Sequence, residues 1–268
     1  MSFVQAGFVY RTGASLLAVA LLAGCASSPT GRSQVLLYSE DQMSEMGAAA
    51  FNEMKKEKPQ SKSLVENHYV DCVAQAIVAQ AAPDRSWEVN VFEGETPNAF
   101  ALPGGKIGVH TGMLEIATNQ AQLAAVLGHE VGHVLANHSN ARASTGTLAK
   151  IAGTGLSVAV DTGTAAGQAT MAAFGLGAQY GILMPFGRAD ESEADLLGLE
   201  YMAKAGFDPR ESVSLWRDME AAGGGQPPEF MSTHPSHGTR IDDLDANMGP
   251  AIRLYEQARA AGKKPRCG

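Results

Sequence analysis

Residues 122–133 read Gln-Leu-Ala-Ala-Val-Leu-Gly-His-Glu-Val-Gly-His, an apolar helical run that ends in the pattern His129-Glu130-x-x-His133. Histidines at positions i and i+4 share one face of a helix. Both imidazoles can therefore reach one zinc ion, with Glu130 beside them as a general base. A pair of solvated helix histidines is the alternative, which the apolar neighbours disfavour. The stretch predicts a metal-binding helix in apolar surroundings.

A catalytic zinc usually takes three protein ligands and a water, so the chain must supply a further donor. Ala136 and Ser139 stand where a metzincin needs glycine and histidine, which excludes that class. His138 lies about half a turn around the helix from His129. We therefore expect His138 at the surface or at a helix end, away from the metal.

The acidic stretch Arg-Ala-Asp-Glu-Ser-Glu-Ala-Asp at residues 188–195 offers the missing donor. Glu191 and Asp195 share a helix face, whereas Glu193 points elsewhere. One of the two can bind zinc while the other orients a ligand histidine through its second ring nitrogen. A solvated acidic helix is the alternative.

The composition excludes several classes of protein. The chain has 268 residues, of which 45% are hydrophobic and 18% charged, with a formal net charge of -8 and three cysteines. The apolar fraction is sufficient for a folded core. We expect no nucleic-acid partner, because such proteins concentrate Lys and Arg on one face. Three cysteines do not make a disulfide scaffold.

The N-terminus has the pattern of a secretory signal, with Arg11 before a short apolar run that ends in Leu22-Ala23-Gly24-Cys25. This ending resembles a bacterial lipobox, which implies removal of residues 1–24 and acylation of Cys25. Ala26, in place of aspartate, implies the outer membrane rather than the inner one. A signal cleaved elsewhere, with Cys25 an ordinary thiol, is the alternative.

A lipid anchor at Cys25 makes residues 25–38 a tether and places the protein in the cell envelope, facing the periplasm. Disulfides persist outside the cytoplasm, and Cys72 and Cys267 are the two remaining cysteines. A bridge between them ties the C-terminus to an early helix, and two buried free thiols are the alternative.

Periodicity predicts an α+β fold over residues 39–268, a mostly helical domain with a short antiparallel sheet beside the helix of residues 122–133. Two helices are expected at residues 39–58 and 62–82, each followed by a proline. Three strands are expected at residues 87–92, 98–102 and 106–110. Helical patterns follow almost to the end of the chain.

Residues 162–187 carry no charged side chain and are dominated by alanine and glycine. These small residues suit close packing in the helical body more than a lipid-facing span. A flap that covers the cleft or contacts the bilayer is a second interpretation.

Five segments together resemble the gluzincin peptidases that include HtpX, the Oma-type proteases and the CAAX prenyl proteases. The segments are His129-Glu130-x-x-His133, Glu191-x-x-Ala194-Asp195, Thr233-His234-Pro235, Arg240-Ile241 and residues 98–107. With the lipobox added, the chain resembles the periplasmic lipoprotein subgroup of LoiP and, more distantly, BepA.

The resemblance implies a zincin-like fold and one zinc ion held by His129, His133 and Glu191. It makes Glu130 the general base, and it makes Asp195 the carboxylate that supports a ligand histidine.

The resemblance also places His234 near the active site, where two roles are open. His234 can stabilise the oxyanion, or it can bind zinc as a fourth ligand, displace water and keep the enzyme latent; a histidine that only packs in a loop is the alternative. His237 is expected at the surface. The strand residues Ala99, Phe100, Ala101 and Leu102 can pair with an extended substrate.

The expected function is that of a zinc-dependent endopeptidase of the bacterial cell envelope that acts on misfolded or unassembled proteins. A zinc-bound water attacks the peptide carbonyl while Glu130 takes the proton. The expected partners are protein or peptide substrates, the membrane through the lipid anchor, and other envelope proteins. The alternative is a chaperone or assembly factor of the outer membrane that retains the fold without proteolysis, although such a module needs neither Glu130 nor a full ligand set.

Overall fold

The computed structural model describes residues 25–154, 186–222, 229–235 and 239–268. The predicted signal at residues 1–24, nearly all of the charge-free segment 162–187, and His237 lie outside the described residues.

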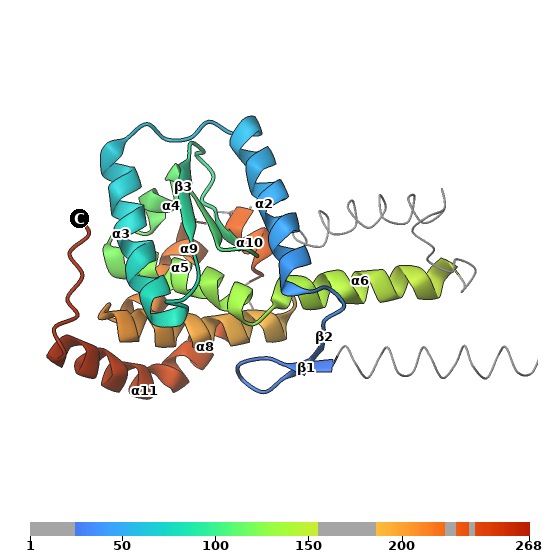
Figure 1. Cartoon of the computed structure of the whole chain (residues 1–268). Helices are drawn as coiled ribbons and strands as arrows, with labels where there is room; N and C mark the ends of the chain where they lie inside the picture. Colours follow the sequence, from blue (N-terminus) through green and yellow to red (C-terminus); the bar gives the residue numbers. More distant parts are fainter. Residues whose placement is uncertain (1–24, 155–185, 223–228, 236–238) are drawn as a thin grey trace, which may run out of the picture.

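A three-stranded sheet stands at one end of the domain (Figure 1). Its strands are β3 (Glu88–Phe92), β4 (Ala99–Leu102) and β5 (Lys106–His110), in the order β3-β5-β4. Gly104 and Gly105 adopt positive φ angles of 80° and 70°, which turns β5 back antiparallel to β4. The other edge of β5 pairs with β3 in parallel. The predicted α+β class is confirmed, and the sheet that was expected to be antiparallel is mixed.

Helices cover both faces of the sheet (Figure 1). On one face, α2 (Glu40–Glu57) packs Phe51 against Phe92 and Leu102. On the other face, α3 (Leu64–Ala81), α4 (Thr111–Ile116) and α5 (Gln120–Leu135) share a core with Val91 and Ile107. Val91 and Phe92 enter different cores because successive strand residues point to opposite faces.

Below the sheet, α5 packs on a layer formed by α8 (Arg188–Ala205), α9 (Arg210–Ala222) and α11 (Arg240–Ala260) (Figure 1). The short α10 (Glu229–Thr233) follows α9, and α6 (His138–Thr154) extends α5 away from the body. Within the described ranges, no helix combines the length and the apolar character needed to cross a bilayer.

Both ends of the described chain are fixed to this body. At the N-terminal end, β1 (Cys25–Ser27) and β2 (Ser33–Val35) form an antiparallel pair, so the expected tether is a folded hairpin. At the other end, the Sγ atoms of Cys72 and Cys267 are bonded at 2.15 Å, the pair expected from the sequence. The disulfide joins the C-terminal segment to α3.

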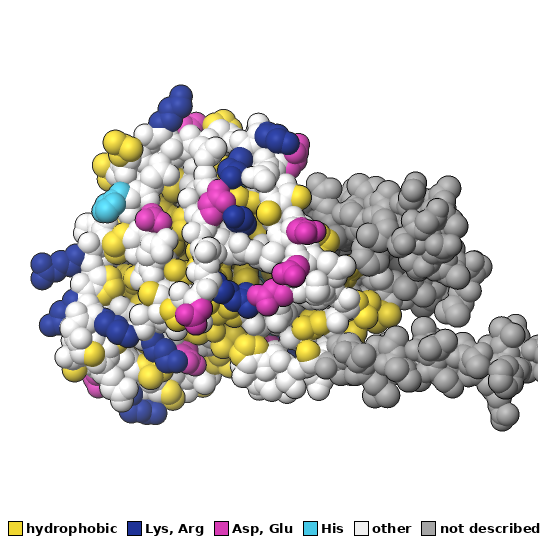
Figure 2. Space-filling model, viewed as in Figure 1, with side chains coloured by type: hydrophobic (Ala, Val, Ile, Leu, Met, Phe, Trp, Pro, Cys, Tyr) yellow, Lys and Arg dark blue, Asp and Glu magenta, His cyan; other side chains and the backbone are white. Residues whose placement is uncertain are grey.

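Both signs of charge are present on the face shown in Figure 2, with apolar side chains between them. The described residues on this face therefore do not form the uniformly basic surface that binds a phosphate backbone.

Helices α5 and α8 cross in close contact at two glycines. A Cβ atom added to Gly198 would lie 2.6 Å from the backbone nitrogen of His129 and 2.9 Å from the carbonyl carbon of Gly128. A Cβ atom added to Gly128 would lie 2.9 Å from the carbonyl oxygen of Gly198. The backbone of the His129 helix thus approaches α8 at a distance that a side chain would prevent.

We expect Gly198→Ala to lower the free energy of unfolding by about 1–3 kcal/mol, because the added methyl group overpacks the crossing. Gly146→Ala is the matched control, since Gly146 is exposed on α6 and its Cβ would meet nothing within 4 Å. That control should gain up to about 1 kcal/mol from helix propensity alone. Urea unfolding of both variants gives the comparison, and a Gly198→Ala protein as stable as wild type contradicts the close crossing.

Candidate metal centre

Helix α5 carries His129, Glu130 and His133 into the interior of the domain. Their exposed fractions are 2%, 2% and 1%. The helix begins at the N-cap Asn119, whose side chain accepts hydrogen bonds from the backbone N–H groups of Ala121 and Gln122. Nearly all of its residues are buried, so this helix is the centre of the core rather than a surface helix.

Four buried side chains bring donor atoms together around one point. They are His129, His133, Glu191 and His234, and one donor atom from each lies within 4.8 Å of all the others. His129 Nε2 and His133 Nε2 are 3.0 Å apart. The Glu191 carboxylate lies 3.4 Å from the first of these nitrogens and 3.3 Å from the second.

The Glu191 carboxylate comes from α8, one helical turn before Asp195. Asp195 Oδ1 lies 2.8 Å from His129 Nδ1 and accepts a hydrogen bond from Arg240 Nη2 at 2.6 Å. Arg240 is 2% exposed, and its guanidinium carbon lies 3.3 Å from the ring centroid of Trp216. Asp195 therefore holds His129 with Nε2 directed to the cluster, in the arrangement expected from the sequence.

The donor set fits a zinc ion. Two imidazoles and one carboxylate are a common ligand set of catalytic zinc sites. Glu191 Oε2 is buried and has no hydrogen-bond partner among the described residues. Arg240 Nη1 lies 3.3 Å from this oxygen, and a metal ion in the cluster would give it a direct ligand bond in addition to that ion pair.

The charges around the cluster also favour a cation. Burial by itself raises the pKa of Glu191, but hydrogen bonds with His129, His133 and His234 outweigh it and hold that pKa below its ordinary value. Burial lowers the pKa of His129, but the charge and hydrogen bond of Asp195, with a smaller effect of Glu191, raise it to about 9. For His133 the largest effect is burial, which lowers its pKa well below the ordinary value and favours the neutral imidazole that binds a metal.

Glu130 lies beside the cluster rather than in it. Its Oε2 accepts a hydrogen bond of 3.2 Å from the backbone N–H of Ala101, while its buried Oε1 has no hydrogen-bond partner among the described residues. Burial raises the pKa of Glu130. One carboxylate oxygen is thus fixed by β4, and the other is available to accept a proton.

His234 reaches the cluster from the end of α10. Its backbone N–H donates to the carbonyl of Phe230 at 2.8 Å, and the Phe230 ring stacks on the imidazole with centroids 4.6 Å apart. His234 Nδ1 lies 3.2 Å from His129 Nε2 and 3.1 Å from Glu191 Oε1. This position matches the fourth-ligand alternative of the two roles left open by the sequence.

His138 lies at a helix end and outside the donor cluster, as expected, but the alternative of a surface position is wrong. Helix α5 ends at Leu135, and Asn137 adopts a φ of 56°, so the chain turns before His138 begins α6. His138 is fully buried, and its Nδ1 lies 2.9 Å from His133 Nδ1. The expected offset of half a turn between His129 and His138 assumed that one continuous helix carries both residues. His138 stays outside the donor cluster and contacts His133 from behind.

Glu193, which was expected to point elsewhere on α8, is buried against the far side of His138. Its Oε2 lies 3.2 Å from His138 Nε2 and 2.8 Å from Arg32 Nη1. Burial raises the pKa of Glu193, but hydrogen bonds from Ser28, Thr30 and His138 lower it to about 2. The burial of Glu193 could not be predicted from the sequence, because its partners lie far away in the chain, at residues 28–32 and 138.

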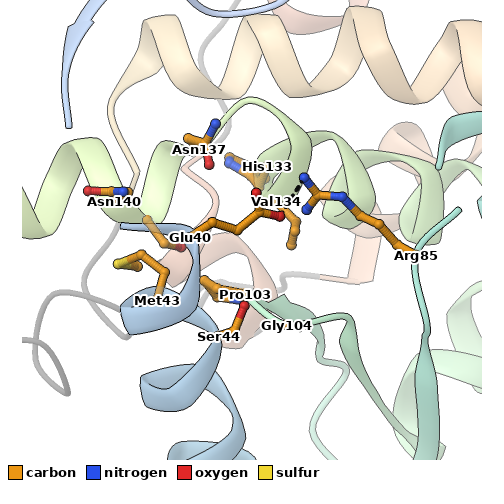
Figure 3. A pocket seen from close by; sticks show the side chains of 11 residues that line it. Glu40, Met43, Ser44, Arg85, Pro103, Gly104, His133, Val134, Asn137 and Asn140 are labelled. Atoms are coloured by element: carbon orange, nitrogen blue, oxygen red, sulfur yellow. Dashed lines mark ion pairs between the residues drawn. The ribbon is translucent and has the colours of Figure 1, made fainter. Parts of the chain in front are cut away.

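A small pocket is lined in part by His133 (Figure 3). It is enclosed by the start of α2, the β4–β5 turn and the α5–α6 junction, and Glu40 pairs with Arg85 beside it at 2.8 Å. His133 is the one member of the donor cluster in its lining, which otherwise consists of Glu40, Met43, Ser44, Arg85, Pro103, Gly104, Val134, Asn137, Ser139 and Asn140.

Two histidines and a carboxylate around one point, with a second glutamate alongside, define the class of zinc metalloendopeptidases. The chain belongs to peptidase family M48, whose family model matches residues 64–248.

Curated relatives agree with this family. The chain is 40% identical over 181 residues to the mitochondrial metalloendopeptidase OMA1 of Schizosaccharomyces pombe, a match that covers 66% of this chain and 51% of the relative. It is 35% identical over 243 residues to the OMA1 metalloendopeptidase of Danio rerio, with 84% and 50% covered. A putative beta-barrel assembly-enhancing protease of Vibrio cholerae is 32% identical over 232 residues, with 80% and 47% covered. The chain spans about half the length of these relatives.

Proposed function

We propose that this metalloendopeptidase works in the bacterial cell envelope, cleaves misfolded or unassembled proteins, and uses His129, His133 and Glu191 as its zinc ligands. The observation that carries the ligand assignment is the convergence of the donor atoms of these three buried side chains around one point. When bound, zinc acidifies a water molecule and polarises the peptide carbonyl.

Glu130 performs the proton transfers in this proposal. The hydrogen bond from Ala101 to Oε2 holds the carboxylate beside the donor cluster, with Oε1 facing His234. Because burial raises its pKa, the carboxylate accepts a proton from water more readily and then passes that proton to the leaving nitrogen. Asp195 and Arg240 keep the His129 ring in place during the reaction.

His234 acts in this proposal as a fourth donor that must withdraw before substrate enters. In the described conformation its Nδ1 occupies the position in which water and the substrate carbonyl would otherwise approach the cluster. Its Nε2 lies 3.4 Å from Glu130 Oε1, so the same ring also covers the base.

We expect Glu130→Gln to bind zinc as wild type does and to lose proteolysis by at least about 100-fold, because the amide cannot take the proton. Zinc content by mass spectrometry and cleavage of casein or a model peptide give the two readouts. Glu115→Gln, an exposed change on α4, is the matched control and should leave both unchanged.

A Glu130→Gln protein that still cleaves peptides at the wild-type rate overturns the mechanism. A wild-type protein that binds zinc but cleaves no unfolded substrate, even after His234→Ala, supports the chaperone or assembly-factor alternative.

Strand β4 is proposed to bind the substrate backbone through Ala99, Phe100, Ala101 and Leu102. β4 is an edge strand of the sheet, and the carbonyl of Asn98 pairs inward with His110 of β5. The N–H of Ala101 instead points outward to Glu130. Because backbone groups alternate along a strand, those of Ala99 and Ala101 face the free edge beside the base. An extended peptide can add to this edge with little sequence preference.

N-methylation of a cleaved model peptide tests this pairing. The backbone N–H groups that would donate to β4 belong to alternate residues of the peptide. Methylation of each of these nitrogens should raise KM by about 2–10-fold, the effect of one lost hydrogen bond. The same peptide methylated at the intervening residues is the control and should be cleaved normally. Equal effects at every position contradict β-strand addition.

The lipoprotein assignment is also a proposal, with residues 1–24 as the signal, Cys25 as the acylated residue, residues 25–38 as the tether and residues 39–268 as the peptidase domain. The lipobox-like ending at Cys25 supports it. The hairpin that starts at Cys25 is fixed to α8 through Arg32, so an anchor there holds the metal centre close to the membrane. In this proposal the chain belongs to the periplasmic lipoprotein subgroup of LoiP.

We expect Cys25→Ser to abolish incorporation of labelled palmitate and to move the protein out of the outer-membrane fraction of a Gram-negative host. Cys72→Ser is the control, because it removes a cysteine elsewhere, together with the disulfide to Cys267, and should keep the label. Labelling of Cys25→Ser at the wild-type level contradicts the anchor.

A further inference from the structure

The two α5 histidines of the cluster each have a support behind the ring, and only one of these supports is a carboxylate. His129 Nδ1 contacts Asp195 at 2.8 Å, whereas His133 Nδ1 contacts the imidazole of His138 at 2.9 Å. His138 in turn contacts Glu193 Oε2 at 3.2 Å through Nε2. His133 is therefore backed by a neutral ring and then a carboxylate.

The direction of the hydrogen bonds along this chain follows from the proposed role of His133. A histidine that binds a metal through Nε2 keeps a lone pair there and carries its proton on Nδ1. That proton is donated to His138 Nδ1, which must then be an acceptor. The proton of His138 therefore lies on Nε2 and is donated to Glu193. Each atom in the chain has one role, and all three side chains are buried.

Glu193 is held in turn by the hairpin at the N-terminal end of the described chain. Its Oε1 accepts hydrogen bonds from the backbone N–H of Thr30 at 3.1 Å and from Thr30 Oγ1 at 2.7 Å. Arg32 Nη1 donates to Glu193 Oε2 at 2.8 Å, and Arg32 Nη2 donates to Asp190 at 2.8 Å. The hairpin thus supplies hydrogen-bond donors to both oxygens of this carboxylate.

The same N-terminal segment also holds the turn that carries His138. The Gln34 side chain donates to the carbonyl of Ala136 at 3.0 Å, and the backbone N–H of Leu37 donates to Ser144 Oγ on α6 at 2.8 Å. Residues 30–37 therefore fix Glu193, and they also fix the junction between α5 and α6, which carries His138.

We propose that His138 and Glu193 are positioning residues for the zinc site, and that the N-terminal hairpin completes their support through Thr30 and Arg32. This inference rests on the proposed ligand role of His133. Loss of a partner behind a ligand histidine typically weakens metal affinity by about 10–100-fold. The hairpin that follows the proposed lipid anchor is therefore part of the metal site.

Two amides at position 138 separate hydrogen bonding from packing. The amide of His138→Asn lies where Nδ1 lies and can still accept from His133. The amide of His138→Gln lies where Nε2 lies and reaches Glu193 alone. We expect His138→Gln to weaken zinc affinity by about 10–100-fold and His138→Asn by clearly less. The measurement is zinc binding to the full chain in competition with a chelator of known affinity, with urea unfolding of the metal-free proteins alongside.

Arg32→Met tests the contribution of the hairpin without changing a ligand or His138, and it also removes the pair between Arg32 and Asp190. It removes the cation that anchors Glu193, and we expect zinc to bind about 2–10-fold more weakly, the effect of one ordinary hydrogen bond, because the exposed part of Arg32 is screened by solvent. Arg210→Met is the matched control, because Arg210 pairs with Asp208 at the surface. It should bind zinc as wild type does.

Several outcomes overturn the inference. Zinc affinity within about twofold of wild type in His138→Gln contradicts a positioning role for His138. Equal losses in His138→Asn and His138→Gln show a role in packing rather than in hydrogen bonding. Wild-type zinc affinity in Arg32→Met shows that the hairpin does not contribute to zinc binding. His133→Ala distinguishes a failure of the ligand assignment itself, because zinc affinity that stays at the wild-type level after this change refutes the ligand role of His133.

Discussion

The close crossing of α5 and α8 is the constraint on which the rest of the structure depends. Gly128 and Gly198 allow the two backbones to meet without side chains between them. Glu191 is thereby brought from α8 to the histidines of α5, and Asp195 one turn later reaches the back of His129. A larger separation would leave carboxylates buried without partners, and an unpaired buried charge costs several kcal/mol.

The buried charges of the centre are balanced in layers around this crossing. Innermost are Glu191 and the three histidines, and Arg240 Nη1 lies 3.3 Å from Glu191 Oε2. Behind them, Arg240 meets Asp195 on one side, and Arg32 meets Glu193 on the other. Each arginine comes from a segment far from α8 in sequence, so folding of the C-terminal helix and of the N-terminal hairpin is coupled to the charge balance of the site.

The arrangement also relates the metal centre to substrate binding. Glu130 contacts both β4, through the N–H of Ala101, and the neighbourhood of His234. The edge strand β4 and the proposed fourth donor His234 thus both contact the carboxylate of Glu130, which is the proposed base. Movement of α10 would uncover the cluster and the base together, while β4 remains fixed in the sheet.

The sequence by itself determined the class of fold and most of the centre. The spacing of His129 and His133 and of Glu191 and Asp195 depends only on helical periodicity, which holds inside a single helix. Local patterns likewise predicted the three strands near their observed positions, and the cysteine count indicated the Cys72–Cys267 pair. Only the tertiary structure decided what lies behind the ligands. His138 is buried behind His133 rather than exposed at the surface, because Asn137 breaks the helix, and the partners of Glu193 are more than fifty residues away. Periodicity carries no information across a turn or between distant segments, so these contacts had to come from the folded chain.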